Sequence, residues 1–420
     1  MAAFPETGPL WYRIASLVCL SCLLALALPR AGGLEDGRLG VLYVGCQARS
    51  QPYWQMRSDP FFRITIVPAT IRGHMLIGPM PAATLDDLHR FIRLYMPRTL
   101  EHVAANYDVI VFFEANVLAV SHHIDKLARS VSDAGLGLLM VGGWQSFGAY
   151  ANYGPPWGET AIGPLLPTED IVGTWHSSPM HRIVMEKPDN EFMKSIPWNV
   201  RDPALQGEVW DHNLLKVRPG AEQLARVVSL DCDAPLMATW RLEGGPRTFS
   251  FASEGGWRLF SMSRWQYDYD FCSNMLIYLD DRPVPQDIAV VQAARSRIFE
   301  VATRRSMLMS LLEFCESFGA NMHGIADMLK EMDQVTAEAL PQYLNLQFED
   351  AIESYREAAE MMEEIEKEAI KLKERALFWV YVTEWLAVTS TALVCGVVLW
   401  SLMVRRRLYR QVRHTRLAAR

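Results

Sequence analysis

Short apolar runs alternate with segments of helical periodicity between residues 38 and 141. The runs are rich in Val, Ile, Leu and Phe, as is typical of strands that are buried on both faces. In the helical segments apolar residues recur three and four positions apart, and Thr84 ahead of Asp86 and Asp87 predicts an N-cap. Strands that alternate with helices predict an α/β domain with a doubly wound, mostly parallel sheet. The predicted strands are Leu39–Gly45, Phe62–Val67, Tyr107–Phe113 and Leu136–Val141, and the predicted helices are Ala83–Tyr95 and His122–Ala134.

The rest of the domain begins with a segment rich in Gly, Pro and aromatic residues, Trp144–Pro167. A segment of this length and composition predicts a long ordered loop over the strand ends. Short strands are predicted after it at Leu236–Arg241, Thr248–Ala252 and Leu259–Ser263, followed by a helix from about Tyr269 to Leu279. The first domain is therefore expected to span residues 36–285.

Residues 286–376 have the character of long helices. In Phe348–Arg375 apolar residues such as Ile352, Tyr355 and Ala359 form a stripe at helical spacing, and charged residues fill most other positions. Such a stripe predicts a coiled coil or a small helical bundle, against which helices from Ile288 to Leu329 would pack. We expect a stalk. Joining copies of the chain, or binding a membrane protein partner, is the alternative use of the stripe.

The stalk leads into the longer of two apolar segments, Leu377–Val404. Its first turns carry Trp379 and Tyr381, which are typical of a membrane interface. Trp385–Val404 alone has about the length that a bilayer requires, so Glu384 is expected at the outer interface. A functional carboxylate inside the membrane is the alternative. The segment predicts a transmembrane helix whose partner is the lipid bilayer.

The other apolar segment, Ile14–Leu28, follows Arg13 and precedes small residues, as in a secretory signal peptide. Residues 1–33 are therefore predicted to be a signal peptide or, alternatively, a retained N-terminal anchor. Residues 405–420 are basic and contain no acidic residue. The positive-inside rule places this tail in the cytoplasm and the region between the two segments outside. We expect a cell-membrane protein that crosses the bilayer once, or twice if the first segment is retained.

The net charge and the cysteine pattern bear on whether the protein binds nucleic acid, a metal or a cofactor. The net charge is −7, whereas nucleic-acid binding requires a basic face, so we expect no nucleic acid partner. The sequence has no CxxC pair and no close cluster of His and Cys residues, so we expect no metal and no cofactor.

One segment resembles a known family. Leu139–Gln145 is similar to the nucleophile elbow of class I glutamine amidotransferases, Gly-hydrophobic-Cys-x-Gly-aromatic-Gln. Five further segments resemble, in order, a glutamine amidotransferase-like family of bacterial proteins, and the resemblance covers about residues 38–282. It implies a flavodoxin-like, class I glutamine amidotransferase-like fold. The five segments are Tyr107–Ile110, Gly142–Tyr150, Leu165–Pro167, Asn213–Ala221 and Phe260–Trp265.

The same alignment places Val141 at the position of the nucleophilic cysteine. Glutamine hydrolysis needs a thiolate, a histidine base and backbone donors for the oxyanion, and valine cannot attack. The His-x-Glu element of the family is also absent near Trp265, so glutaminase activity by the family mechanism is not expected. A rebuilt pair of Cys46 with a histidine at position 122, 123, 176, 181 or 212 is an alternative.

A binding pocket is still predicted, because open α/β sheets bind ligands beyond the carboxyl ends of their strands. Its aromatic and polar residues suit a sugar, a peptide or an amino acid. Three functions remain open: a non-catalytic sensor or binding module, a hydrolase with a different active site at the same sheet edge, and a structural or assembly role. The pocket candidates are Cys46, Glu114, Gly142, Gly143, Trp144, Gln145, Ser146, Trp265 and Asp268.

Overall fold

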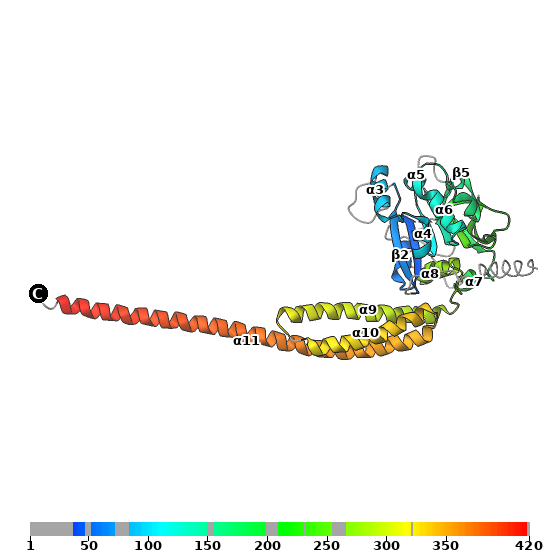
Figure 1. Ribbon diagram of the computed structural model, residues 1–420. Helices are drawn as coiled ribbons and strands as arrows, with labels where there is room; N and C mark the ends of the chain where they lie inside the picture. Colours follow the sequence, from blue (N-terminus) through cyan, green and yellow to red (C-terminus); the bar gives the residue numbers. More distant parts are fainter. Residues whose placement is uncertain are drawn as a thin grey trace, which may run out of the picture. The chain divides into compact units, whose positions relative to one another are not determined.

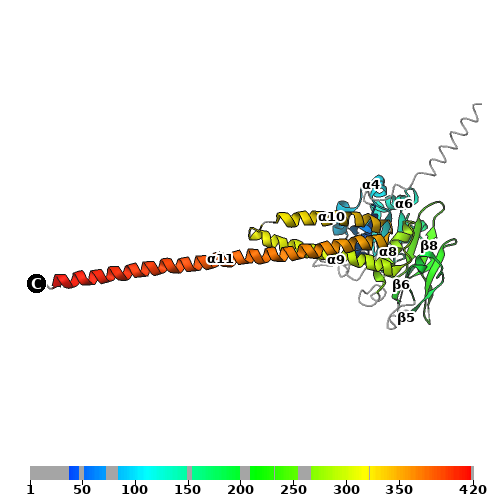
Figure 2. The same ribbon diagram turned by 90° about the horizontal axis from the view of Figure 1, so that it is seen from below.

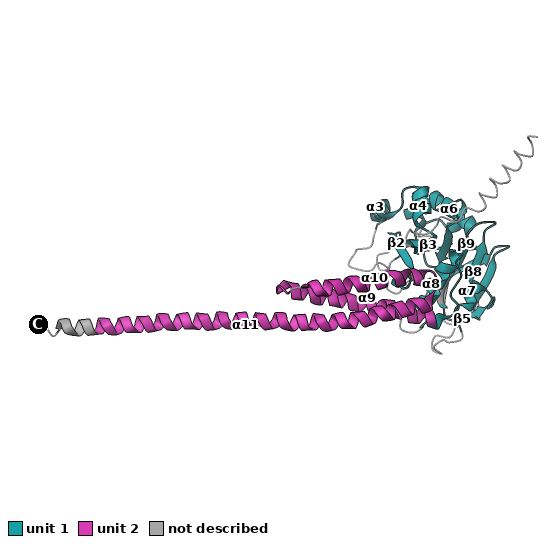
Figure 3. Ribbon diagram, turned by 60° about the horizontal axis from the view of Figure 1, so that its bottom comes forward, with its two compact units in different colours: residues 1–289 teal, residues 290–420 magenta. Residues whose placement is uncertain are grey.

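The computed structural model describes residues 37–46, 52–71, 84–148, 154–198, 209–230, 232–253, 266–320 and 322–417 (Figure 1). The chain divides into two compact units, Met1–Ala289 and Val290–Arg420 (Figure 3). The predicted signal peptide or anchor at residues 1–33, the predicted strand Leu259–Ser263 and the pocket candidate Trp265 lie outside the described residues.

The first unit is a mixed α/β domain around a 9-stranded sheet with the order β2-β1-β3-β4-β9-β8-β7-β5-β6. Neighbouring strands from β2 to β9 pair in parallel, and those from β9 to β6 pair antiparallel. The described strands that the apolar runs predicted are all present. The bounds are β1 Leu39–Gly45, β2 Phe62–Pro68, β3 Val109–Phe113, β4 Gly137–Val141, β5 Thr168–Met185, β6 Val209–Val217, β7 Glu222–Val228, β8 Asp233–Arg241 and β9 Arg247–Phe251.

The antiparallel strands β5, β6 and β7 were not predicted from the sequence. The pairing of β5 with β6 shifts register between Asp170 and Trp175 and again between Ser177 and His181. Such irregularities interrupt the alternation by which a half-buried strand is recognised in a sequence. The predicted loop Trp144–Pro167 ends where β5 begins, and its described part contains two short 3₁₀ helices, η4 (Trp157–Glu159) and η5 (Gly163–Leu165).

Helices cover both faces of the parallel strands. On one face, strand residues such as Leu42 and Ile110 share a buried apolar cluster with Leu88 of α3 and Leu127 of α6. On the other face, the Tyr43 ring lies 5.4 Å from that of Tyr53 on α2. The helices of this unit are α2 Pro52–Ser58, α3 Leu85–Tyr95, α4 Leu100–Asn106, α5 Val117–Val120, η2 Ser121–His123, α6 Ile124–Ser132, α7 Glu191–Lys194 and α8 Asp268–Leu279.

The predicted cap of α3 is confirmed, and it is reciprocal. The Asp87 backbone N–H donates to the Thr84 side chain, and the Asp87 carboxylate accepts from the Thr84 backbone N–H. This capping box satisfies two of the backbone donors that a helix start leaves unpaired. The helix predicted at His122–Ala134 is divided into η2 and α6.

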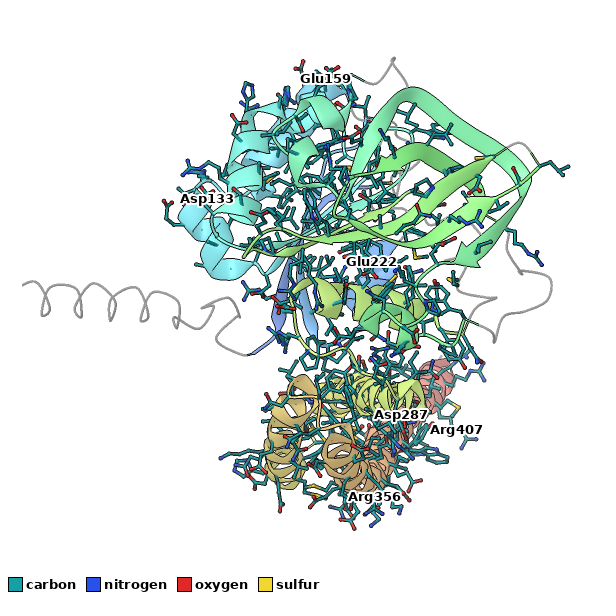
Figure 4. The ribbon with its side chains drawn as sticks, turned by 90° about the vertical axis from the view of Figure 1, so that its right-hand side faces the viewer. Asp133, Glu159, Glu222, Asp287, Arg356 and Arg407 are labelled. Atoms are coloured by element: carbon teal, nitrogen blue, oxygen red, sulfur yellow. The ribbon has the colours of Figure 1, made fainter. Side chains whose placement is uncertain are left out.

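The second unit consists of α9 (Ile288–Ser317), α10 (His323–Leu344) and α11 (Phe348–Leu417) (Figure 2). Of the predicted stripe of α11, Tyr355, Met362, Ile365 and Ala369 are buried, whereas Ile352, Ala359 and Leu372 are partly exposed. Ion pairs join the helices, with Arg304 bonded to Glu366 and Arg305 to Asp333. Arg356 on the exposed side of α11 pairs within its own helix (Figure 4). Beyond the bundle, α11 contains a segment that is long and apolar enough to cross a membrane.

Candidate functional site

The carboxyl ends of β1, β3, β4 and β9 lie at one edge of the sheet. Their register pairs Gly45 with Phe113, Phe113 with Val141, and Val141 with Phe251. The residues that follow these strand ends therefore gather at the same edge, among them Cys46 and Glu114. This is the edge at which open α/β sheets bind ligands, and the described pocket candidates other than Asp268 come from it.

Val141 lies inside regular strand pairing. Its side chain is fully buried, and the next N–H, that of Gly142, donates to the Phe251 carbonyl at 2.7 Å. A nucleophile elbow requires a sharp, strained turn at this position. Near this sheet edge, described non-glycine residues with positive φ are Glu114 and Phe147, each with φ 51°, and Val141 is not among them. The strand thus lacks both the nucleophile and the turn that would expose one.

One of the two residues of this edge with a left-handed backbone is Glu114, directly after β3. Its side chain is 2% exposed, and its carboxylate accepts hydrogen bonds from the Trp144 N–H and, at 3.1 Å, from the Gln145 N–H. Its own N–H donates to Ser146 Oγ at 3.2 Å, and its carbonyl accepts from Thr70 Oγ1 at 2.8 Å. A left-handed backbone at a glutamate costs about 1–3 kcal/mol, so surrounding contacts must hold it in place. The carboxylate occupies the position in which backbone donors after β4 could otherwise bind a ligand anion.

Asn213 of β6 holds the same turn from the other side. Its Oδ1 accepts from the Gly143 N–H at 2.8 Å, and its Nδ2 donates to the Gly143 carbonyl at 3.1 Å and to the Ser146 carbonyl at 3.4 Å. Gly143 has φ +149°, and a Cβ on it would clash with the Glu114 carboxylate. Glycine is therefore required here for both its backbone and its lack of a side chain.

The side chains of the turn face different partners. Gln145 Oε1 accepts from the Ile71 N–H at 3.2 Å, while Trp157 Nε1 donates to the Gln145 carbonyl at 3.0 Å. Trp144 is half-buried, whereas Ser146 is buried and its hydroxyl accepts from Glu114. No described histidine contacts Ser146, so the geometry gives this hydroxyl no base. Asn213 and Trp157 were not singled out as site residues, although Asn213 begins one of the segments that resemble the family.

Asp268 belongs to a different cluster. It begins α8, and its Oδ2 accepts from Gln55 Nε2 of α2 at 3.1 Å, whereas no described residue hydrogen-bonds its buried Oδ1. Burial raises the pKa of Asp268 to about 7, an effect that the Gln55 hydrogen bond opposes and nearby Asp270 reinforces. The pocket candidates therefore fall into two groups: those at or near the turn after β4, which Glu114 hydrogen-bonds, and Asp268 at the contact between α2 and α8.

Tyr43 of β1 lies between these two groups. Burial raises the pKa of its hydroxyl well above the usual value, and Cys46, Cys272, Tyr53 and Glu114 act in the same direction. Within the described residues its hydroxyl has no hydrogen-bond partner. An unsatisfied buried hydroxyl is rare in native proteins and requires an explanation, such as an absent water or ligand.

The candidate histidines lie in separate places. His122 and His123 line, with His89, a cleft of about 400 Å³ between α3 and η2. Burial, with Lys126 and His122 nearby, lowers the pKa of His123 to about 4. The backbones of His176 and His181 belong to β5, and their side chains lie outside the described part.

His212 has a thiol neighbour that the sequence analysis did not pair with it. The Cys232 Sγ lies 3.8 Å from His212 Nε2, and His212 Nδ1 lies 3.2 Å from the Asn213 carbonyl oxygen. His212 is fully buried and Cys232 is partly exposed. As for metals, the described ranges contain no group of three or more His, Cys, Asp and Glu residues that could hold an ion.

Comparisons with known proteins add little to this geometry. No family model matches the sequence, and no curated protein matches it. The structure is similar to that of a protein described as a cytoplasmic protein from Salmonella typhimurium LT2, with a TM-score of 0.43 and 17% sequence identity. The match covers 57% of this chain and 99% of that one. A likeness this weak supports no conclusion about function.

Proposed function

We propose that this chain is a membrane-anchored, extracytoplasmic pseudoenzyme that uses a glutamine amidotransferase-like domain to bind a ligand or a partner. One observation carries the proposal. The position of the family nucleophile holds Val141 in an unbroken β4–β9 ladder, and the backbone donors after it are already bonded to Glu114 and Asn213. Such a site can neither attack an amide nor stabilise an oxyanion.

The strand order supports the proposed fold family. The parallel strands follow the order β2-β1-β3-β4-β9, which is the order 2-1-3-4-5 of flavodoxin-like doubly wound sheets when β9 is counted as the fifth parallel strand. In such sheets the ligand-binding crevice lies where the strand order reverses, here between β1 and β3. Cys46 and Glu114 follow these two strands.

Ligand binding rather than a purely structural role is favoured by a polar atom of β1, one of the two strands that border this crevice. The Tyr43 hydroxyl is buried and has no hydrogen-bond partner among the described residues. A ligand with hydroxyl or amide groups, such as a sugar, a peptide or an amino acid, would satisfy it.

Anchoring rests on α11. Most of its large apolar residues from Phe378 to Met403 are more than half exposed to solvent, and Val380 and Val382 are partly exposed; such exposure is costly in water and favourable in lipid. The basic residues that follow, such as Arg405 and Arg407, support a cytoplasmic C-terminus. Protease protection of sealed membrane vesicles tests this orientation, because external protease should remove only one side of the chain.

Two measurements test the absence of catalysis. The full chain should release no glutamate from glutamine, and Val141→Cys should not restore release because the turn's backbone donors stay bonded to Glu114 and Asn213. Glutamate release by either protein would contradict the proposal.

Ligand binding is tested by a thermal-shift screen against amino acids, sugars and cell-wall peptides. We expect one chemical class to raise the melting temperature, and Trp144→Ala to abolish the shift. Trp240→Ala, at a half-buried tryptophan of β8, is the matched control and should retain it. If no class shifts the melting temperature, the structural role is favoured instead.

Hydrolysis at another site is the second candidate, and the contact between Cys232 and His212 favours it. A thiol beside an imidazole whose other nitrogen faces a carbonyl is the arrangement of a nucleophile, its base and an orienting group. His212 directly precedes Asn213, the β6 residue that hydrogen-bonds the turn after β4. Hydrolysis of a chromogenic ester that Cys232→Ser abolishes would support this candidate, and an equal rate in both proteins would exclude it.

A further inference from the structure

The bundle of the second unit has a tip at the end of α9 and the start of α10, beside the last buried turns of α11. Gly324, Ile325 and Met328 of α10 share a cleft with Lys371 and Arg375 of α11. Cys315, close to the end of α9, is buried near enough to Lys373 for that ammonium to influence its pKa. These contacts fix the tip at the level of residues 371–376 of α11.

The cleft at this tip combines cations with an apolar floor. It has a volume of about 380 Å³, with Ile325, Met328 and Leu372 on its apolar side, and the carboxylate of Glu368 also lines it. Lys371 pairs with Glu368 at 2.7 Å, whereas Arg375 is exposed and forms no ion pair with any described residue. A guanidinium without a carboxylate beside an apolar surface suits an amphipathic anion.

An aromatic pair is exposed at the same tip. Phe314 is 39% exposed and Phe318 is 44% exposed, and their ring centroids lie 4.8 Å apart. Exposed aromatic pairs of this kind favour a membrane interface or a protein partner. How close the Phe314–Phe318 pair lies to the apolar segment of α11 distinguishes a membrane interface from a protein partner.

That segment begins directly after the bundle. Among the side chains of α11 that the structure describes, Ala376 is the last buried one, and Phe378 and Trp379 are each 61% exposed. At about 1.5 Å per residue, Arg375 lies about 6 Å along the axis from Trp379. The headgroup layer on one side of a bilayer is about 5–8 Å thick. With Trp379 in the aromatic belt, Glu384 lies about 8 Å deeper, as in the alternative of a carboxylate inside the membrane, and the tip reaches the headgroups of the same leaflet.

We propose that the tip of the three-helix bundle binds the bilayer, with the phosphate of an anionic phospholipid at Arg375 and Lys371 and with Phe314 and Phe318 inserted among the headgroups. The proposal rests on the membrane anchoring proposed above. Its consequence is mechanical, because a second attachment beside α11 fixes the direction in which the bundle leaves the membrane.

A lipid occupant agrees with the features of the tip better than a protein does. The cleft, with its apolar floor and its cations, and the exposed aromatic pair lie within about two helical turns of the apolar segment of α11, which is itself suited to lipid. A phospholipid supplies the matching phosphate and acyl chain, and its local concentration at this position is set by the bilayer.

The test uses the full chain in nanodiscs of phosphatidylcholine alone or with about a third phosphatidylglycerol. Native mass spectrometry measures the anionic lipid that stays bound, and hydrogen exchange measures protection of the Phe314–Phe318 amides. We expect protection to increase with phosphatidylglycerol. Lys371→Gln/Arg375→Gln should retain less of this lipid, by up to about fivefold for each cation removed, and Phe318→Ser should lose amide protection.

Arg356→Gln/Lys367→Gln is the matched control, since it removes two exposed cations of the same helix outside the cleft. It should behave as the parent chain. Equal lipid retention in the two double variants, or tip protection that does not depend on phosphatidylglycerol, would overturn the proposal. Protection by inorganic phosphate in lipid-free micelles would also overturn it, because it would identify a free anion as the ligand.

Flotation of the full chain with liposomes separates the outcomes: a chain that floats with an unprotected tip contradicts this inference alone, and a chain that does not float contradicts the anchoring.

Discussion

Replacing Glu114 with alanine should destabilise the first unit by about 3 kcal/mol. The substitution leaves the backbone N–H groups of Trp144 and Gln145 without their acceptor, and a buried donor without a partner costs about 1–3 kcal/mol. Alanine also retains the cost of a left-handed backbone at φ 51°. Removal of a buried charge offsets part of this loss. Glu114→Gly loses the same carboxylate but relieves the backbone, so it should be about 1 kcal/mol more stable than Glu114→Ala.

Urea unfolding of the full chain in detergent, followed by tryptophan fluorescence, measures this difference, because most tryptophans precede residue 290. Glu159→Ala removes an exposed carboxylate of the same domain (Figure 4) and should change stability by less than about 0.5 kcal/mol. If Glu114→Ala unfolds at the same urea concentration as Glu159→Ala, the carboxylate does not hold the turn and the argument for an occupied anion position fails.

Two further substitutions test the site. Asp268 has a folded-state pKa raised to about 7 by burial, so its stabilising contribution is complete below the unfolded pKa of about 4 and is lost as pH rises through 7, by about 3 kcal/mol between pH 5 and pH 8. Asp268→Asn should flatten this dependence in urea unfolding at several pH values, and an unchanged pH slope would contradict the raised pKa. Gly143→Ala should lower the melting temperature strongly because its Cβ would collide with the Glu114 carboxylate and its φ is +149°. A melting temperature within a degree of the parent would show that the turn is not packed as described.

Much of the architecture could be predicted from local pattern. The apolar runs identified the parallel strands because a strand buried on both faces must be apolar along its length. Thr84 and Asp87 formed the expected cap, since both capping partners lie within one helical turn. The stripe of α11 and its apolar continuation were visible for the same reason: helical periodicity repeats every few residues.

The candidate site depended on contacts that have no local pattern. Glu114 was expected at the sheet edge, but its role as the acceptor for the turn after β4 joins residues 31 positions apart, and Asn213 reaches Gly143 across 70 positions. Asp268 was grouped with the same crevice from its position in the chain, whereas its hydrogen bond is to Gln55, 213 positions away.

The sequence by itself determined the parallel strands, the long helices and which helix is apolar enough for a membrane. Only the tertiary structure decided that a glutamate bonds the turn's backbone donors and that an antiparallel strand supplies the asparagine opposite it. The physical reason is that secondary structure follows from neighbours along the chain, while a hydrogen bond between side chain and distant backbone exists only once the sheet has brought its strands into register.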